Sequence, residues 1–292
     1  MRLQAEDVDE IYYVYVIDDE ERLKGVLPLK KLITSPSASK IKYVMKTEPI
    51  SVKDNDPIEE VAEKIEKYDL VALPVVDSIG RLVGRITIDD VIDEIREQHE
   101  RDYQLASGIS QDIEASDKVY MQTAARLPWL LIGMAGGLAN SILLGGFDSL
   151  FAANPKMALF IPLIGGTGGN VGIQSSAIVV QGLANNSLKQ AKLWSLIAKE
   201  VVVALINASI ISLVVFLFNY FFLGDVLVMS AVSISLFSVV LFASIFGTMV
   251  PMLLDRLKID PAIATGPFIT ITNDLIGMMI YMLVATLLAQ AL

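Results

Sequence analysis

The stretch IDPAIATGPFITITNDLIGMMIY, from Ile259 to Tyr281, holds one acid, Asp274, deep inside an apolar segment. No charged residue occurs in 261–273 or in 275–292. At about 1.5 Å per residue, a helix of this length crosses a bilayer core roughly 30 Å thick. We therefore predict a membrane-spanning helix with a carboxylate near its middle.

The predicted helix places Asp274 among small and polar residues, because residues three or four apart share a face. That face consists of Gly266, Thr270, Asp274, Gly277 and Tyr281. A carboxylate at membrane depth is costly unless something compensates it, and no Lys, Arg or His lies in any other predicted span to pair with it. We expect its partner to be a cation from outside the chain. The alternative is an acid hydrogen-bonded to a neighbouring helix for packing.

The composition divides the chain into a charged part, 1–126, and a nearly charge-free part, 127–292. Overall, 53% of the 292 residues are hydrophobic and the mean hydropathy is +0.55, which is typical of membrane proteins. The net charge of −10 argues against a nucleic-acid partner and suits a cation. Without cysteine, disulfides, Cys-ligated zinc and thiol catalysis are excluded, and one histidine, His99, cannot build a zinc site or a triad alone.

The charge-free stretches predict five spans, at 127–147, 157–188, 201–224, 226–254 and 261–292. Basic residues gather in two of the connecting loops, at Lys189, Lys192, Lys199, Arg256 and Lys258. The positive-inside rule places these loops and the N-terminus in the cytoplasm, so that the C-terminus lies outside. The charged start of the sequence does not resemble a signal peptide, which leads to the same orientation.

The second predicted span has an unusual composition, with five glycines in residues 165–172. Each glycine destabilises a helix by about 1 kcal/mol relative to alanine. We therefore expect a broken backbone here, with Gly169, Asn170 and Gly172 lining a pore, because such backbone survives at membrane depth only beside protein or water. Tight helix packing is the alternative. A phosphate-binding loop is excluded, since no Gly-Lys-Ser/Thr follows.

The charged part contains an internal repeat, with Asp77 lying 59 positions after Asp18. In both copies an apolar run ends at this Asp and Arg-Leu-x-Gly follows, which predicts strand, tight turn and strand. A helix follows each pair, at 29–33 and from Asp89 onward. The second copy begins with an extended stretch, 44–52, and a helix capped by Asp56 with core positions Ile58, Val61, Ala62 and Ile65.

This repeat resembles the cystathionine-β-synthase (CBS) domain, which works as a pair. We assign a partial first repeat to 1–40, the second to 41–98, a connecting helix and linker to 99–126 and the membrane domain to 127–292. The opening strand of the first copy would lie before Met1. The resemblance implies a cleft for ATP or another adenosine nucleotide, with Thr87 and Asp89 near ribose and phosphate. The alternative is a plain helix start capped by Thr87.

The motifs GTGGNVGIQSSAIVV, 166–180, and LDRLKIDPAIATGPFITITNDLIGMMIY, 254–281, resemble those of the MgtE family of magnesium channels and transporters. That resemblance implies a homodimer with a pore on its two-fold axis and Asp274 as the pore acid. The pore would hold Mg²⁺ through its water shell, which Mg²⁺ gives up reluctantly. The expected pore-lining residues are Gly266, Thr270, Gly277, Gly169, Asn170 and Gly172. The N-terminal helical domain of the family is absent from this sequence.

The same resemblance implies feedback by cytoplasmic Mg²⁺. A plug helix, from about Glu97 to Val119, would close the pore when Mg²⁺ bridges acids across the dimer, and repulsion between them would open it at low Mg²⁺. The expected regulatory residues are Asp260, Asp90, Asp93, Asp102, Glu59, Glu66 and Asp69. A helix cap is an alternative, compatible role for Asp260. Gln98 and Arg101 stand where acids are common in the family.

The expected fold is therefore an α+β CBS pair, joined by a long helix to an all-α membrane domain of five helices. The expected function is Mg²⁺ import through a channel in the plasma (inner) membrane. The alternatives are a proton- or sodium-coupled carrier and a membrane-bound cation or nucleotide sensor without transport. We do not expect an enzyme, because no nucleophile pair presents itself.

Overall fold

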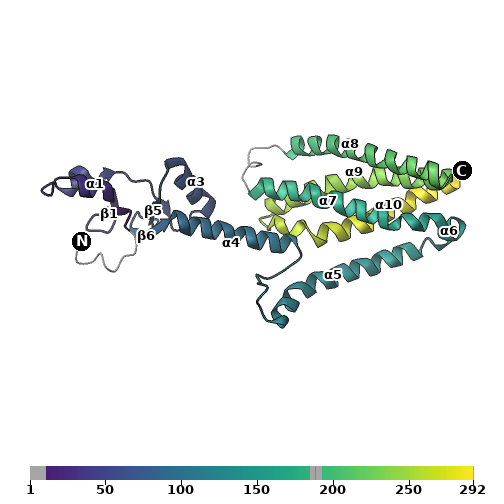
Figure 1. Ribbon diagram of the computed structural model, residues 1–292, viewed down its shortest axis with the longest axis horizontal. Coiled ribbons are helices and arrows are strands. Elements are labelled where there is room, and N and C mark those ends of the chain that lie inside the picture. The colour runs from purple at the N-terminus through teal and green to yellow at the C-terminus, as the bar shows by residue number, and fades with distance from the viewer. Residues whose placement is uncertain (1–10, 185–187, 189–192, 292) are drawn as a thin grey trace. The chain divides into compact units, whose positions relative to one another are not determined.

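The computed structural model describes residues 11–184, 188 and 193–291 (Figure 1). Lys189 and Lys192, on which the predicted orientation partly rests, lie outside the described residues. The chain divides into two compact units, Met1–Glu100 and Arg101–Leu292. The boundary falls within helix α4, Ile88–Ala106, which ends in the second unit.

The first unit contains two small sheets, which confirms the two predicted strand–turn–strand motifs. The first has the order β1-β2-β3 and the second β4-β5-β6. The antiparallel hairpins β1–β2 and β5–β6 correspond to the two repeats, while β4 runs parallel to β5. The strands are β1 Tyr13–Ile17, β2 Leu23–Pro28, β3 Lys46–Thr47, β4 Val52–Lys53, β5 Ala72–Val76 and β6 Leu82–Thr87. Because β3 pairs with β2, part of the region assigned to the second repeat completes the first sheet.

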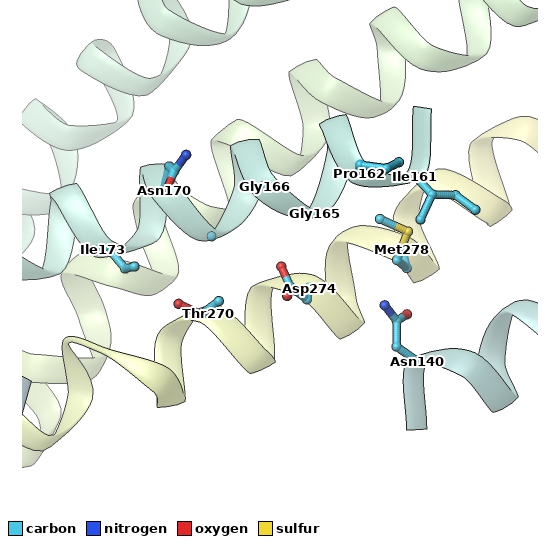
Figure 2. A pocket seen from close by; sticks show the side chains of 11 residues that line it. Asn140, Ile161, Pro162, Gly165, Gly166, Asn170, Ile173, Thr270, Asp274 and Met278 are labelled. Atoms are coloured by element: carbon cyan, nitrogen blue, oxygen red, sulfur yellow. The ribbon is translucent and has the colours of Figure 1, made fainter. Parts of the chain in front are cut away.

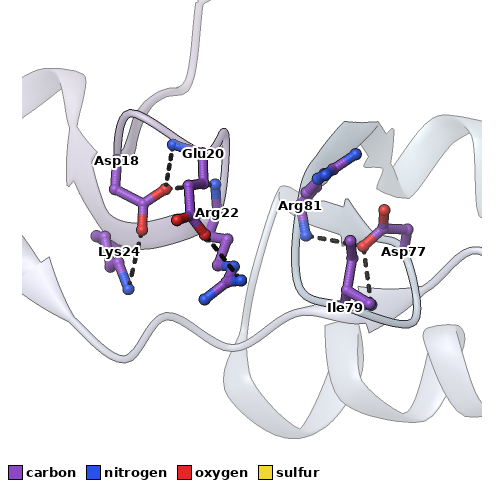
Figure 3. Close-up of polar contacts among 7 residues, drawn as sticks. All are labelled: Asp18, Glu20, Arg22, Lys24, Asp77, Ile79 and Arg81. Atoms are coloured by element: carbon purple, nitrogen blue, oxygen red, sulfur yellow. Dashed lines mark hydrogen bonds and ion pairs between the residues drawn. The ribbon is translucent and has the colours of Figure 1, made fainter.

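The two hairpins turn in the same way (Figure 3). Asp18 Oδ1 accepts hydrogen bonds from the amides two and four residues later, at 3.0 and 2.9 Å. Asp77 Oδ1 does the same, at 3.0 and 2.8 Å. The turns also pair with each other through Arg22 and Arg81. The repeat read from the sequence is therefore a structural repeat.

The helices of the first unit pack on these sheets. They are α1 Leu29–Thr34, α2 Ile41–Val44, α3 Ile58–Tyr68 and the start of α4 Ile88–Ala106. Val61 and Ile65 of α3 are buried with Val52, Leu73 and Val91, as the helical spacing predicts. The prediction that Asp56 caps α3 is wrong. Pro57 is the N-cap, and Asp56 instead accepts from the amide of Lys53 and pairs with Lys64 at 3.2 Å.

The second unit contains helices and no strands among its described residues (Figure 1). Its helices are α5 Val119–Gly145, α6 Asp148–Ala153, η2 Pro155–Phe160, α7 Ile161–Ala184, α8 Leu193–Phe222, α9 Val226–Arg256, η3 Pro261–Ala264 and α10 Pro267–Ala291. Helix α9 lies at the centre, packed against α7, α8 and α10, while α5 packs against α10. Tyr281 of α10 is fully buried, and its hydroxyl donates to the carbonyl of Met157 at 2.9 Å.

Four helices among the described residues are long and apolar enough to cross a membrane: α5, α9, α10 and Trp194–Phe222 of α8. The remaining predicted span, 157–188, corresponds to α7, which has 24 residues but is not among these four. The glycines of α7, together with Asn170 and Gln174, lower its mean hydropathy. The five-span topology therefore stays a prediction.

Helix α7 is continuous through residues 165–172, so the expected break in its backbone is wrong. The glycines serve close packing, which offsets their low helix propensity. A Cβ on Gly168 would lie 2.9 Å from Val239 Cγ1 of α9. A Cβ on Gly247 of α9 would collide with the backbone of Gly172. Helix packing, the alternative interpretation of this stretch, therefore explains the glycines at Gly168 and Gly172.

Helix α4 ends at Ala106, so the expected helix to Val119 is too long. Gly108 adopts φ +76°, and the amides of Gly108 and Ile109 bond back to the carbonyls of Leu105 and Gln104, the Schellman arrangement. The Gln104 side chain then fixes the following loop by exchanging two hydrogen bonds with the backbone of Ile113, at 2.9 and 3.2 Å.

Candidate ion-binding site

A pocket of about 280 Å³ lies between α5, α7 and α10 (Figure 2). Its walls combine bare helix backbone with a few polar side chains in otherwise apolar helices. The lining residues are Asn140, Ile161, Pro162, Gly165, Gly166, Gly169, Asn170, Ile173, Thr270, Asp274 and Met278. Four of the predicted pore residues, Asp274, Thr270, Gly169 and Asn170, are therefore brought together.

The carboxylate of Asp274 faces the glycine surface of α7. A Cβ on Gly165 would lie 3.4 Å from Asp274 Oδ1, and one on Gly169 would lie 3.7 Å from it. Asp274 is half-buried, and within the described chain nothing donates a hydrogen bond to it or pairs with its charge. The alternative reading, an acid bonded to a neighbouring helix for packing, does not describe this geometry.

Thr270 lies one turn before Asp274 on the same wall of the pocket. Its hydroxyl donates to the carbonyl of Gly266 at 3.3 Å, which leaves the oxygen lone pairs available to a further donor. Asn170, on the opposite helix, is exposed and also lines the pocket. The walls thus present acceptor groups around an open volume, an arrangement that suits a cation with its water shell.

Three glycines expected to line the pore lie outside this pocket. Gly172 is buried, and its missing side chain makes room for Asn273 and Ile269 of α10. Gly277 is buried against Val239 and Ile164, with a Cβ–Val239 separation of 3.4 Å. Both serve helix packing and neither lines this pocket, so their pore-lining role stays a prediction.

Gly266, the third of these glycines, lies at the start of α10. A Cβ there would collide with the carbonyl of Ala106, at the end of α4, and Gly108 similarly abuts Pro267, with a Cβ-to-Cγ separation of 2.6 Å. Asp260, just upstream, caps η3 by accepting from the amide of Ala262 at 2.8 Å. The capping alternative for Asp260 is confirmed.

The predicted regulatory acids are dispersed in the single chain. No three acidic or histidine side chains within the described residues gather to hold a metal ion. Glu59 and Glu66 lie on α3, Asp69 ends α3 in a left-handed conformation, Asp93 is exposed on α4 and Asp102 belongs to the second unit. A regulatory metal site would need acids from more than one element, unit or chain.

Asp90 and Thr87 form a capping box at the start of α4. Asp90 Oδ2 accepts from the Thr87 amide at 2.8 Å and from its hydroxyl at 2.6 Å, while the Asp90 amide donates to Thr87 Oγ1 at 3.3 Å. The Thr87 hydroxyl bond holds the pKa of Asp90 below its usual value. The plain helix start expected as the alternative for Thr87 is confirmed, whereas nucleotide binding by Thr87 and Asp89 stays a prediction.

Sequence reasoning missed a second carboxylate, Glu200 of α8, because it stands at the edge of a charge-free stretch. Ser175 of α7, which is 6% exposed, donates to Glu200 Oε1 at 2.7 Å and lies 3.3 Å from the hydroxyl of Ser244 on α9. Three helices are thereby joined by one polar chain. The pocket position of Asn140 was likewise not predicted from the sequence.

The pocket lies among helices that are long and apolar enough to cross a membrane, and the chain is similar to known ion transporters. The model of the MgtE family, a divalent cation transporter, matches residues 161–284, and the CBS domain model matches 41–97. Proteins named magnesium transporter MgtE are 34% identical in Bacillus subtilis and 35% in Thermus thermophilus, over 99% and 100% of this chain. The chain is therefore similar to proteins of the MgtE family, whose named members are transporters.

The chain spans about two thirds of the length of these relatives, 64% and 65%. Among solved structures, the cytosolic domain of the Mg²⁺ channel MgtE in complex with ATP is 44% identical to this chain. That match covers 32% of this chain and 38% of the other, with a TM-score of 0.31.

Proposed function

We propose that this protein conducts divalent cations, Mg²⁺ in the first place, through the pocket at Asp274. The observation that carries the proposal is a half-buried carboxylate without a partner among the described residues, set against bare glycine backbone between apolar helices. Such a charge is costly at membrane depth, so a cation beside it is strongly favoured. At roughly 30 Å³ per water, the pocket has room for several waters, enough for a hydrated ion.

The assembled pore is a homodimer in this proposal, with Asp274 of two chains facing each other across the two-fold axis. Two carboxylates at close range repel each other unless a cation lies between them, so ion and dimer stabilise one another. Cytoplasmic Mg²⁺ would close the pore by bridging Glu59, Glu66, Asp69, Asp90, Asp93, Asp102 and Asp260 across the chains. The dispersion of these acids in one chain supports a site completed by the second.

The charged unit lies in the cytoplasm and the C-terminus outside in this proposal, with the protein in the plasma (inner) membrane. The basic residues Arg256 and Lys258 after α9 support that orientation. An adenosine nucleotide would bind the first unit. A small cavity there, lined by Tyr13 and Tyr15, lies between the two repeats, and the buried hydroxyl of Tyr15 has no partner among the described residues.

The test is Mg²⁺ flux into proteoliposomes, comparing wild type with Asp274→Asn, which keeps the side-chain shape and removes the charge. We expect flux in the wild type and a loss of at least tenfold in the variant. Equal flux in both proteins would refute the proposed role of Asp274. Raising Mg²⁺ on the side of the charged unit should close the wild-type pore, and flux that ignores it would reject the regulatory role of the acids.

The same preparation separates the two alternative functions. A proton- or sodium-coupled carrier would show flux that depends steeply on the pH or sodium gradient at fixed voltage, whereas a channel would follow the Mg²⁺ gradient and voltage alone. A sensor without transport would show binding of Mg²⁺ but no flux in either protein.

A further inference from the structure

Asn140 gives the pocket a third polar wall, on α5. Its side chain is directed into the space that also contains Asp274 and Met278 (Figure 2). The amide oxygen is buried and accepts no hydrogen bond from any described residue. A buried acceptor without a donor costs free energy, so a donor from outside the described chain is expected at this position.

The register of α5 against α10 places Asn140 at the level of the pore acid. Gly136, one turn before Asn140, lies against α10, because a Cβ there would collide with Ile271. The two helices run side by side in the same direction (Figure 1), so one turn further along both brings Asn140 level with the segment that contains Asp274. The contact of Gly136 therefore fixes where Asn140 sits.

The chemistry of an amide fits the water shell of a cation. Waters bound to a divalent cation point their protons outward and need acceptors around them. The carbonyl of Asn is a neutral acceptor with two lone pairs, and the terminal torsion of Asn is soft, so the oxygen can turn toward the ion. A carboxylate on one wall and an amide on another would hold a hydrated ion from two sides.

We infer that Asn140 is a specificity-determining residue that binds the water shell of the divalent cation at Asp274. The inference rests on the proposed function, because it needs an ion in this pocket. It assigns α5 a direct part in ion selection in addition to its packing against α10.

The experiment measures Mg²⁺ flux into proteoliposomes over a range of Mg²⁺ concentrations for Asn140→Leu, Asn140→Asp and Asn140→Ser. Loss of the acceptor in Asn140→Leu should raise the half-saturating concentration by about threefold to tenfold. The added charge in Asn140→Asp should lower it, and the hydroxyl in Asn140→Ser should keep it within about twofold of wild type. Asn154→Asp, the same substitution outside the pocket, is the matched control and should leave it unchanged.

The opposite shifts of the Leu and Asp variants distinguish ion contact from packing. If Asn140 acted only in packing, both variants would lower maximal flux and protein yield without moving the half-saturating concentration in opposite directions. Flux that requires Asp274 but has the same half-saturating concentration in all three variants overturns this inference alone. Flux that survives Asp274→Asn overturns the proposed function, and this inference with it.

Discussion

Substitution of Gly172 by alanine should destabilise the helical unit, although alanine is the better helix former. The new Cβ would collide with Asn273 and lie 2.7 Å from Ile269 Cγ2 on α10. Helix α7 cannot retreat, because the backbone of Gly172 already abuts Gly247 of α9 on another side. Overpacking costs about 1–3 kcal/mol, and the helix preference for alanine recovers about 1 kcal/mol. Because both new contacts lie below 3.0 Å, we expect the upper part of the overpacking cost, about 2–3 kcal/mol, and therefore a net loss of about 1–2 kcal/mol.

The two tryptophans, Trp129 and Trp194, both lie in the second unit, so their fluorescence reports its unfolding on heating. A loss of about 1–2 kcal/mol in a unit of this size corresponds to a fall in apparent melting temperature of about 2–8 °C. The scan rate must be fixed, because membrane proteins often unfold irreversibly. Gly166→Ala, on the same helix but facing open space, is the control. A Gly172→Ala protein that melts at or above the wild-type temperature would refute the packing argument.

Thr87→Ala should remove the capping box and lower the local stability of the first turn of α4 by about 1 kcal/mol. Amide exchange in that turn should then be faster than in wild type, and an unchanged rate would contradict the prediction. The low pKa of Asp90 means that this cap stabilises the fold above the unfolded pKa of Asp, about 3.9, and is lost as pH falls through the folded pKa. Protection of the first α4 amides, measured relative to their intrinsic exchange rates, should therefore fall in the wild type as the pH is lowered through this range, and constant protection would contradict this. Glu200→Leu should lower the melting temperature more than Glu200→Gln, since only the amide still accepts from Ser175; equal shifts would show that this bond contributes little. Gln104→Ala should expose the loop after α4 to limited proteolysis, while a cleavage rate equal to wild type would argue against its anchoring role.

The sequence was a good guide where the signal is local. The repeated Asp turns, the core spacing of α3 and the long apolar helices follow from residues near one another in the chain. The position of Asp274 opposite a glycine-rich helix also follows, because a lone acid in an apolar span requires a polar surrounding.

The errors arose where distant partners decide the outcome. The glycines of α7 look like a break in isolation, but Val239 and Gly247, far along the chain, supply the packing that keeps the helix continuous. Asn140 carried a usable signal, a lone amide in an apolar span, but its register against α10 could not be read from sequence. The early end of α4 was signalled by Gly108, whose positive φ stops the helix.

The glycines opposite Asp274 limit how mutation can change the volume of the pocket. Glycine is the smallest residue, so every missense change at Gly165 or Gly169 adds volume beside the carboxylate and none removes it. Substitutions at these two positions can therefore only narrow the pocket. Variants with a larger pocket must arise at other lining residues, such as Thr270 and Asn140, where the side chain can shrink as well as grow.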